Sequence, residues 1–218
     1  MLIRRGTEMS IVSVAYLKDG IVMSSDCRGS FTKIVDGVKV TKTIDRAPKT
    51  FLIENINVGI SYCGNMRLHG ELFHTAINRF FKEHLDENDN VCTVAKKIFN
   101  EYKKNETIFI VCGYFENEQL VYCIENDLKC INKTGANHYH GVKPFGMTES
   151  VTRIVYPHYS QTNWTEISLE KGVNITEEMV TCAIENEASC GKPISTLIID
   201  SSSAYWIRKN GQTQTIKL

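Results

Sequence analysis

The order in which strand-like and helix-like segments follow one another limits this chain to a small set of folds. Apolar residues alternate from Ile11 to Leu17, an Asp19-Gly20 turn follows, and a second apolar run, Ile21-Val22-Met23, leads to Asp26. This pattern predicts a β-hairpin. A further strand pair is predicted over residues 50–62, so the first part of the chain is β-rich and antiparallel.

Helical spacing of apolar residues then predicts two consecutive amphipathic helices, at 68–85 and 91–102. Strands return afterwards. A further helix is expected from about Thr176 to Ala188, capped by Asn174. Segment 146–172 is the least regular, with a possible helix starting near Thr148. The later strands are expected at 107–113 and 120–124, with 128–133 and 138–142 continuing the same meander, and at 194–199 and 205–208.

Strands, a helix pair, more strands, a helix and final strands make an α+β order rather than alternating βαβ units. Two antiparallel sheets face to face with helices outside would cover every apolar stripe, which predicts a four-layer α/β/β/α sandwich. We expect a single domain over residues 10–218, preceded by residues 1–9 as a leader, a propeptide or a misassigned start.

Charge and hydropathy exclude several classes of partner. Lysine plus arginine equals aspartate plus glutamate, 25 against 25, so the chain lacks the positive field that attracts nucleic acid or anionic membranes. No window approaches the roughly 20 apolar residues of a membrane helix, and the start lacks an apolar stretch of signal-peptide length. We therefore expect a cytoplasmic protein without nucleic-acid or membrane partners.

The eight cysteines are scattered, without CxxC pairs or histidines at ligand spacing. This distribution predicts buried thiols rather than disulfides, and neither a metal site nor a cofactor is expected. The positions are Cys27, Cys63, Cys92, Cys112, Cys123, Cys130, Cys182 and Cys190.

Four blocks of sequence, in the same order along the chain, resemble the proteasome β subunits and the bacterial proteasome-like peptidases, which are N-terminal-nucleophile hydrolases. Together the blocks span most of the chain. They are the run from Ser10 to Arg28, Lys49-Thr-Phe-Leu-Ile-Glu54 leading to Tyr62-Cys-Gly64-Asn65, Phe109-Ile-Val-Cys-Gly113-Tyr114 leading to Tyr122, and Ala188-Ser-Cys-Gly191 leading to Pro193-Ile194.

The resemblance implies a catalytic group with Ser10 as nucleophile and its own α-amine as base. A free α-amine has a pKa of about 7.7–8.0, close to neutral pH, and can therefore accept the hydroxyl proton. Lys49 would place a positive charge beside that amine, and Asp26 would orient and neutralise the lysine. The backbone N–H near Gly64 would stabilise the oxyanion.

Each of these residues also has a simpler interpretation. Ser10 could simply begin a strand, and Asp26 could belong to a turn or pair with Arg28 on the surface. Lysines in the preceding loop compete with Lys49 for its role, although only Lys49 directly precedes the Phe-Leu-Ile strand as the family lysine does. The competing lysines are Lys33, Lys39 and Lys42.

The nucleophile must also become the first residue of the mature chain. Family precursors often cleave themselves before it, usually after glycine, whereas here Met9 precedes Ser10. We favour a second route, in which Met9 is the true start and its removal exposes the serine amine. The DNA sequence tests this route. If translation starts at Met9, the codons of Arg4 to Gly6 should be purine-rich, because they would form the ribosome-binding sequence upstream of that start.

Other positions depart from the family pattern. Glu187 and Cys190 stand where the family commonly has an aspartate and a serine that support the amine, and Gly141 stands in place of a further supporting serine. Cys27, Cys63 and Cys190 are thiols near the predicted site, but none would carry the terminal amine, so a thiol nucleophile is disfavoured. These departures predict a catalytic group that is weakened but not abolished.

Two functions remain open. The first is an N-terminal-serine endopeptidase or amide hydrolase that acts on peptides or unfolded protein inside a homo-oligomeric ring or related assembly. The second is a non-catalytic proteasome-like subunit with a structural role.

Overall fold

The computed structural model describes residues 10–36 and 38–214, and two antiparallel sheets form its centre. The six-stranded sheet has the order β14-β1-β2-β15-β16-β17, and the five-stranded sheet has the order β11-β10-β9-β6-β5. Strand bounds in the first are β1 Ile11–Leu17, β2 Gly20–Asp26, β14 Gly141–Gly146, β15 Ile194–Ile199, β16 Ala204–Lys209 and β17 Gln212–Thr213. In the second they are β5 Thr50–Ile53, β6 Val58–Gly64, β9 Thr107–Phe115, β10 Glu118–Ile124 and β11 Leu128–Cys130.

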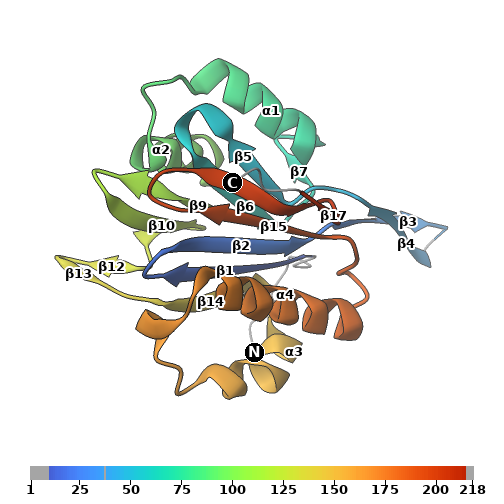
Figure 1. Ribbon diagram of the computed structural model, residues 1–218. Coiled ribbons are helices and arrows are strands. Elements are labelled where there is room, and N and C mark those ends of the chain that lie inside the picture. Colours follow the sequence, from blue (N-terminus) through green and yellow to red (C-terminus); the bar gives the residue numbers. More distant parts are fainter. Residues whose placement is uncertain (1–9, 37, 215–218) are drawn as a thin grey trace.

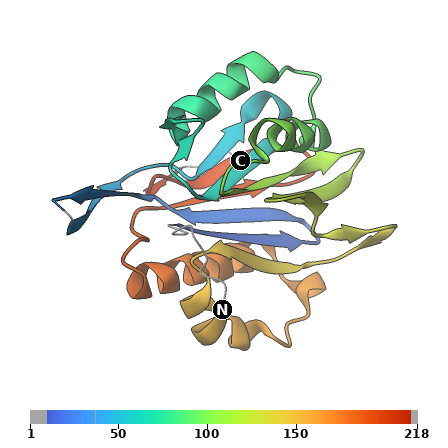
Figure 2. The ribbon, with the colours of Figure 1, turned by 180° about the vertical axis from the view of Figure 1, so that it is seen from behind.

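The helices pack on the outer faces of the two sheets. In Figure 1, α1 (Phe73–His84) and α2 (Val91–Tyr102) lie beside the five-stranded sheet, and α3 (Glu149–Ile154) and α4 (Leu169–Asn186) lie beside the six-stranded sheet. Figure 2 shows the same arrangement from behind. One apolar cluster joins α1 and α2 to β6 and β9, and another joins α3 and α4 to β1 and β2. Short 3-10 turns also occur at Glu54–Ile56, Tyr156–Tyr159 and Trp164–Glu166.

A third apolar cluster lies between the two sheets and holds them face to face. Its members come from alternate positions of the strands, as expected when one face of each strand points at the opposite sheet. They are Val12, Val14, Ile21, Met23, Cys63, Ile110, Cys112, Val121, Phe145, Leu197 and Ile199.

A two-stranded hairpin, β3 (Arg28–Val35) with β4 (Val38–Asp45), projects from the body of the molecule beyond β2 (Figure 1). Val38, Val40 and Ile44 on β4 are 64%, 42% and 47% exposed.

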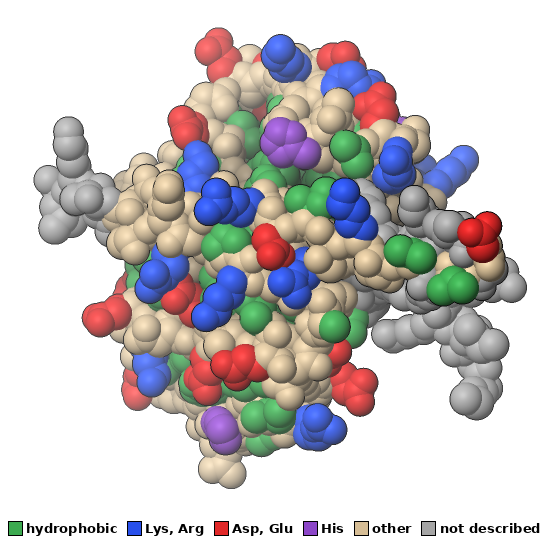
Figure 3. Space-filling model, turned by 90° about the vertical axis from the view of Figure 1, so that its right-hand side faces the viewer, with side chains coloured by type: hydrophobic (Ala, Val, Ile, Leu, Met, Phe, Trp, Pro, Cys, Tyr) green, Lys and Arg blue, Asp and Glu red, His purple; other side chains and the backbone are tan. Residues whose placement is uncertain are grey.

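The side of the molecule that faces the viewer in Figure 3 carries acidic and basic side chains intermixed, with no large area of one sign. Two more strand pairs are short: β7 Arg67–Leu68 with β8 Glu71–Leu72, and β12 Lys133–Thr134 with β13 Asn137–His138.

The combination of antiparallel sheets with separate helices that the sequence predicts is confirmed. The predicted start of the last helix is wrong, because α4 begins at Leu169 and Ser168 caps it by accepting a hydrogen bond from the N–H of Lys171. Gly172 lies inside this helix for a packing reason: a Cβ there would lie 2.5 Å from a methyl carbon of Leu17. Asn174 is therefore a helical residue rather than a cap.

Two other boundaries also differ from the prediction. The first helix begins at Phe73, because the segment that precedes it forms the β7–β8 pair. The strand expected at 138–142 to continue the meander is β14, which starts at Gly141 and pairs with β1 in the other sheet. The helix expected near Thr148 is confirmed as α3, for which Thr148 is the N-terminal flanking residue.

No disulfide forms among the described residues, which include all eight cysteines, and this agrees with the expectation of thiols. Cys92, Cys123 and Cys130 are partly buried and the other five are buried. Across residues 10–36 and 38–214, no helix has the length and apolar character needed to cross a membrane.

Candidate active site

Ser10 lies immediately before β1 and is fully buried. Its carbonyl oxygen accepts a hydrogen bond of 2.8 Å from the N–H of Met147. Gly146, at the end of β14, has φ +87°, and a Cβ there would lie 2.1 Å from the Ser10 carbonyl oxygen. This close approach requires glycine, so the end of β14 fixes the backbone of Ser10.

Lys49 is the lysine that reaches Ser10. Its Nζ donates a hydrogen bond of 2.5 Å to the Ser10 Oγ, and the residue is fully buried just before β5. The same Nζ lies 3.7 Å from the Sδ of Met66 and 5.4 Å from the centre of the Tyr62 ring. Burial lowers the pKa of Lys49, while the negative charge of Asp26 acts in the opposite direction.

The competing lysines have different surroundings. Lys42 is exposed on β4 of the projecting hairpin. Lys33 and Lys39 are in the same hairpin, and their side chains lie outside the described part of the structure. The geometry thus favours Lys49 as the partner of Ser10.

Asp26 ends β2 and is also fully buried. One carboxylate oxygen accepts the N–H of Ile11 at 3.1 Å, and the other accepts the N–H groups of Arg28 at 3.0 Å and Gly191 at 3.1 Å. Burial raises the pKa of Asp26, whereas Lys49 and these three donors lower it. Asp26 therefore influences Lys49 by its charge, and its hydrogen bonds hold the start of β1 against the loop at Gly191.

Arg28 links this loop to the hairpin. Its guanidinium contacts both carboxylate oxygens of Asp45, at 2.8 and 3.4 Å, and donates to the carbonyl oxygens of Ala188 and Cys190 at 3.3 and 3.2 Å. A Cβ at Gly191 would lie 2.4 Å from the Arg28 Nε. The alternative in which Asp26 pairs with Arg28 at the surface does not hold, because the carboxylate of Asp26 is buried and its contact with Arg28 is to the backbone.

Gly64 ends β6 with φ +117°, and a Cβ there would lie 2.7 Å from the carbonyl oxygen of Glu106. Glycine is thus required at this turn. The preceding residue, Cys63, lies against Gly146, where an added Cβ would be 3.1 Å from the Cys63 Cβ. Gly64 therefore lies beside the segment that holds Ser10, and its role as an oxyanion donor stays a prediction.

Glu187 and Cys190, the two residues near the end of α4 that differ from the family pattern, relate to the site in different ways. Cys190 is buried close enough to Asp26 and Lys49 for their charges to act on it, and burial raises its pKa to about 12. Glu187 is partly buried, and its carbonyl oxygen accepts the N–H of Cys190 at 2.9 Å. Cys190 thus belongs to the surroundings of the candidate site, and Glu187 fixes its backbone.

The prediction that Gly141 stands in a supporting position beside the nucleophile is wrong. In the β1–β14 pair Gly141 faces Tyr16, whereas Gly146 faces Ile11, which follows Ser10. Gly141 is therefore at the far end of β1, because adjacent residues advance about 3.3 Å along a strand. The sequence alone does not give the register in which β14 pairs with β1, so it cannot tell which of the two glycines lies beside Ser10.

The thiols around Lys49 are poor nucleophile candidates. Burial raises the pKa of Cys27 to about 11, and its Sγ lies 3.4 Å from the Ser195 Oγ. A thiol reacts as the thiolate, so a raised pKa keeps it inert near neutral pH. Sequence reasoning missed Met66 and Tyr62, which cover Lys49, since neither residue type marks such a position.

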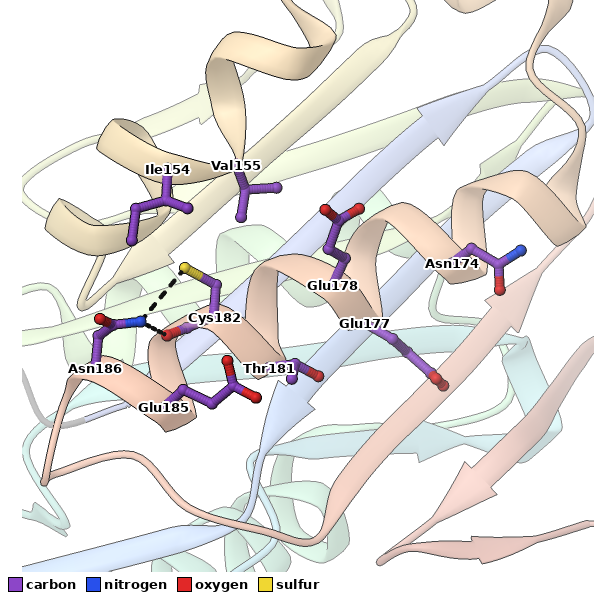
Figure 4. A pocket seen from close by; sticks show the side chains of 9 residues that line it. All are labelled: Ile154, Val155, Asn174, Glu177, Glu178, Thr181, Cys182, Glu185 and Asn186. Atoms are coloured by element: carbon purple, nitrogen blue, oxygen red, sulfur yellow. Dashed lines mark hydrogen bonds between the residues drawn. The ribbon is translucent and has the colours of Figure 1, made fainter.

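A cavity of 470 Å³ lies elsewhere, between α3 and α4 (Figure 4). Asn186 lines it and donates from its side chain to the carbonyl oxygen of Cys182 at 2.8 Å. The lining includes none of Ser10, Asp26 and Lys49. Within the part of the chain that the structure describes, no group of three histidine, cysteine or acidic residues could hold a metal ion.

The fold is similar to that of Anbu, a bacterial proteasome-like protein. Two solved structures of Anbu from Hyphomicrobium sp. strain MC1, one of them a Gly-1 mutant, each match with a TM-score of 0.62 and 14% sequence identity. The matches cover 91% and 90% of this chain and 87% of each Anbu chain. No family model matches the sequence, and no curated protein does.

Proposed function

We propose that this chain is a proteasome-like peptidase or amide hydrolase that uses Ser10 as its nucleophile. The observation that carries the proposal is the 2.5 Å hydrogen bond from the Lys49 Nζ to the Ser10 Oγ, in a buried group that also includes Asp26. The fold shared with Anbu supports it. The domain comprises residues 10–218, arranged as a four-layer α/β/β/α sandwich.

The proposed reaction is acyl transfer to the serine followed by hydrolysis. The Ser10 Oγ attacks the substrate carbonyl carbon, and the hydroxyl proton passes to the Ser10 α-amine, directly or through water. The tetrahedral oxyanion then collapses, the C–N bond breaks, and the protonated amine returns the proton to the leaving nitrogen. Water attacks the resulting ester by the same route, which releases the acid and restores Ser10.

The neighbours of Ser10 would stabilise charge during these steps. The positive charge of Lys49 would favour the developing alkoxide of Ser10 and lower the proton affinity of the amine beside it. Asp26, which is buried near Lys49, would compensate that charge. The N–H near Gly64 would donate to the oxyanion.

The proposal requires a free amine at Ser10, whereas in the full sequence this nitrogen forms a peptide bond with Met9. An amide nitrogen is not a base, so residues 1–9 must be absent from the active form. Removal of Met9 from a chain that starts there is the route we favour. We further propose a cytoplasmic homo-oligomer that acts on peptides or unfolded protein.

The test expresses the protein from Met1 and from Met9 and measures intact mass, N-terminal sequence and peptidase activity. We expect activity only in chains that begin with Ser10, and a loss of about a thousandfold or more in Ser10→Ala and Lys49→Ala. Lys18→Ala, on the exposed turn between β1 and β2, is the control. Retention of Met9 in native protein, or activity unchanged by both substitutions, would overturn the proposal.

A non-catalytic role is the second candidate, and one observation favours it. Ser10, Asp26 and Lys49 are all 0% exposed, so a substrate reaches them only if covering groups move. An epoxyketone probe, which reacts with both the hydroxyl and the α-amine of such a serine, separates the two functions. Labelling of Ser10 supports the enzyme, and no labelling of a chain proven to start at Ser10 supports the structural role.

A further inference from the structure

Three hydroxyl groups form a continuous hydrogen-bonded chain between the two sheets. The Thr50 Oγ1 lies 2.8 Å from the Ser25 Oγ and 2.8 Å from the Ser61 Oγ, and all three residues are buried. Ser25 is on β2 of the six-stranded sheet, while Thr50 and Ser61 face each other on β5 and β6 of the five-stranded sheet. The bond between Ser25 and Thr50 therefore joins the two sheets.

This polar link lies in surroundings where polar groups are costly. The cluster that fills the space between the sheets is apolar, and buried hydroxyls without partners destabilise a fold. Each of the three hydroxyls has a partner in the chain, so the link is satisfied. A hydrogen bond also requires defined distance and direction, which apolar contacts do not. The link therefore fixes how β2 and β5 lie relative to each other more narrowly than packing alone would.

The position of the link along both strands relates it to the candidate site. Ser25 directly precedes Asp26, and Thr50 directly follows Lys49. The two residues joined across the sheets are thus the chain neighbours of the two charged residues of the site. Movement of β5 relative to β2 would displace Lys49 from both Asp26 and Ser10.

We infer that Thr50 is a positioning residue, whose hydroxyl, held between Ser25 and Ser61, sets the place of the Lys49 ammonium relative to Ser10. Thr50 does not touch the reacting atoms. Its effect on catalysis rests on the proposed function, whereas its effect on the place of Lys49 does not.

The titration of the Lys49 ammonium can report on its position, because charged and titratable groups surround it. Asp26 acts on the Lys49 ammonium from β2, Cys63 from β6, and Cys27 and Cys190 from the loops at the ends of β2 and α4. A displaced Lys49 would gain solvent and change its distances to these groups, so its titration would change. This can be followed by NMR of protein labelled with 13C at lysine Cε, with the Lys49 signal assigned by its loss in Lys49→Met.

The test compares Thr50→Val, which keeps the shape and removes the hydroxyl, with Thr50→Ser, which keeps the hydroxyl. Ser24→Ala is the matched control, because the Ser24 Oγ also has two buried partners, Thr176 at 2.8 Å and Thr196 at 3.2 Å, on the α4 side of β2. Both Thr50→Val and Ser24→Ala should lower stability in urea. The Lys49 midpoint should move toward the ordinary value of about 10.4 only in Thr50→Val.

For the mature protein, Thr50→Val should lower kcat by about tenfold or more with KM little changed, and Thr50→Ser should recover most of the loss. If the wild-type protein has no activity, the proposed function fails, and the Lys49 titration still decides the role of Thr50. An unchanged Lys49 midpoint in Thr50→Val, or an equal change in Ser24→Ala, would overturn the inference. Should Thr50→Val not fold, Ser25→Ala cuts only the bond between the sheets and replaces it in the same comparison.

Discussion

The Nζ of Lys49 lies 2.5 Å from the Oγ of Ser10, and neither side chain is exposed to solvent. Burial lowers the pKa of Lys49 below its value in an unfolded chain, which is about 10.4. Between these two pKa values the unfolded state binds more protons than the native state. The free energy of unfolding therefore rises with pH across this window because of Lys49.

We predict that Lys49→Met removes this rise. Urea midpoints of wild type and Lys49→Met, measured from neutral pH to about pH 10, should give a difference curve that favours the wild type increasingly as pH increases. Buried thiols and tyrosines with raised pKa values act in the opposite direction, but they are common to both proteins and largely cancel. Parallel curves would contradict the prediction.

Gly146→Ala should be strongly destabilising, because its φ is +87° and the new Cβ would lie 2.1 Å from the Ser10 carbonyl oxygen. Gly70→Ala is the control, since Gly70 has φ +84° but nothing lies within 4 Å of the position of a Cβ. Gly70→Ala should cost about 1–2 kcal/mol from backbone strain alone, and Gly146→Ala several kcal/mol more. Equal costs in urea unfolding would mean that β14 does not hold Ser10 as described.

Arg28 and Asp45 should contribute unequally to stability although they form one ion pair. Asp45 is largely exposed, so Asp45→Asn should have little effect on stability, because solvent screens an exposed ion pair. Arg28→Met should cost about 1–3 kcal/mol, because the carbonyl oxygens of Ala188 and Cys190 also lose a donor. Chemical denaturation of the two variants measures this, and a larger effect of Asp45→Asn would reverse the assignment.

The thiols should react in an order set by burial. Cys92, Cys123 and Cys130 are partly buried and should be alkylated first in native protein. Cys27 and Cys190, whose pKa values burial raises to about 11 and about 12, should react only on unfolding. Mass mapping after timed exposure to iodoacetamide near neutral pH checks the order. Early modification of Cys27 or Cys190 would show that the site opens readily.

Residues with a strong local signature were predictable from the sequence. The Asp-Gly turn and flanking alternation located β1 and β2 and thus placed Asp26 at a strand end. The resemblance favoured Lys49 over the hairpin lysine Lys42, because Lys49 directly precedes the Phe-Leu-Ile strand as the family lysine does, and the structure brings Lys49 to Ser10. Both Asp26 and Lys49 are positioned by the strand next to them, so a local match was enough to locate them.

Features set by contacts between distant segments were not predictable. The contact that fixes Ser10 depends on β14 pairing with β1 in the other sheet, and no periodicity in the sequence reveals this pairing. Gly141 was therefore assigned to the supporting position beside Ser10, whereas Gly146 is the glycine that lies there. The start of α4 was missed because Gly172 interrupts the apolar pattern, although it serves close packing against Leu17. The hydrogen bond between Thr50 and Ser25 was also missed, because an isolated serine or threonine in a strand does not indicate which strand of the other sheet it contacts.

The pairing of β2 with β15 has a consequence for synthesis of the protein. β2 lies between β1 and β15 in its sheet, and β15 begins only at Ile194. While a ribosome is still making the middle of the chain, one edge of β2 therefore has no partner strand, and Asp26 lacks the N–H of Gly191. Nascent chains that stall before β15 is made would expose an unpaired edge, which favours aggregation.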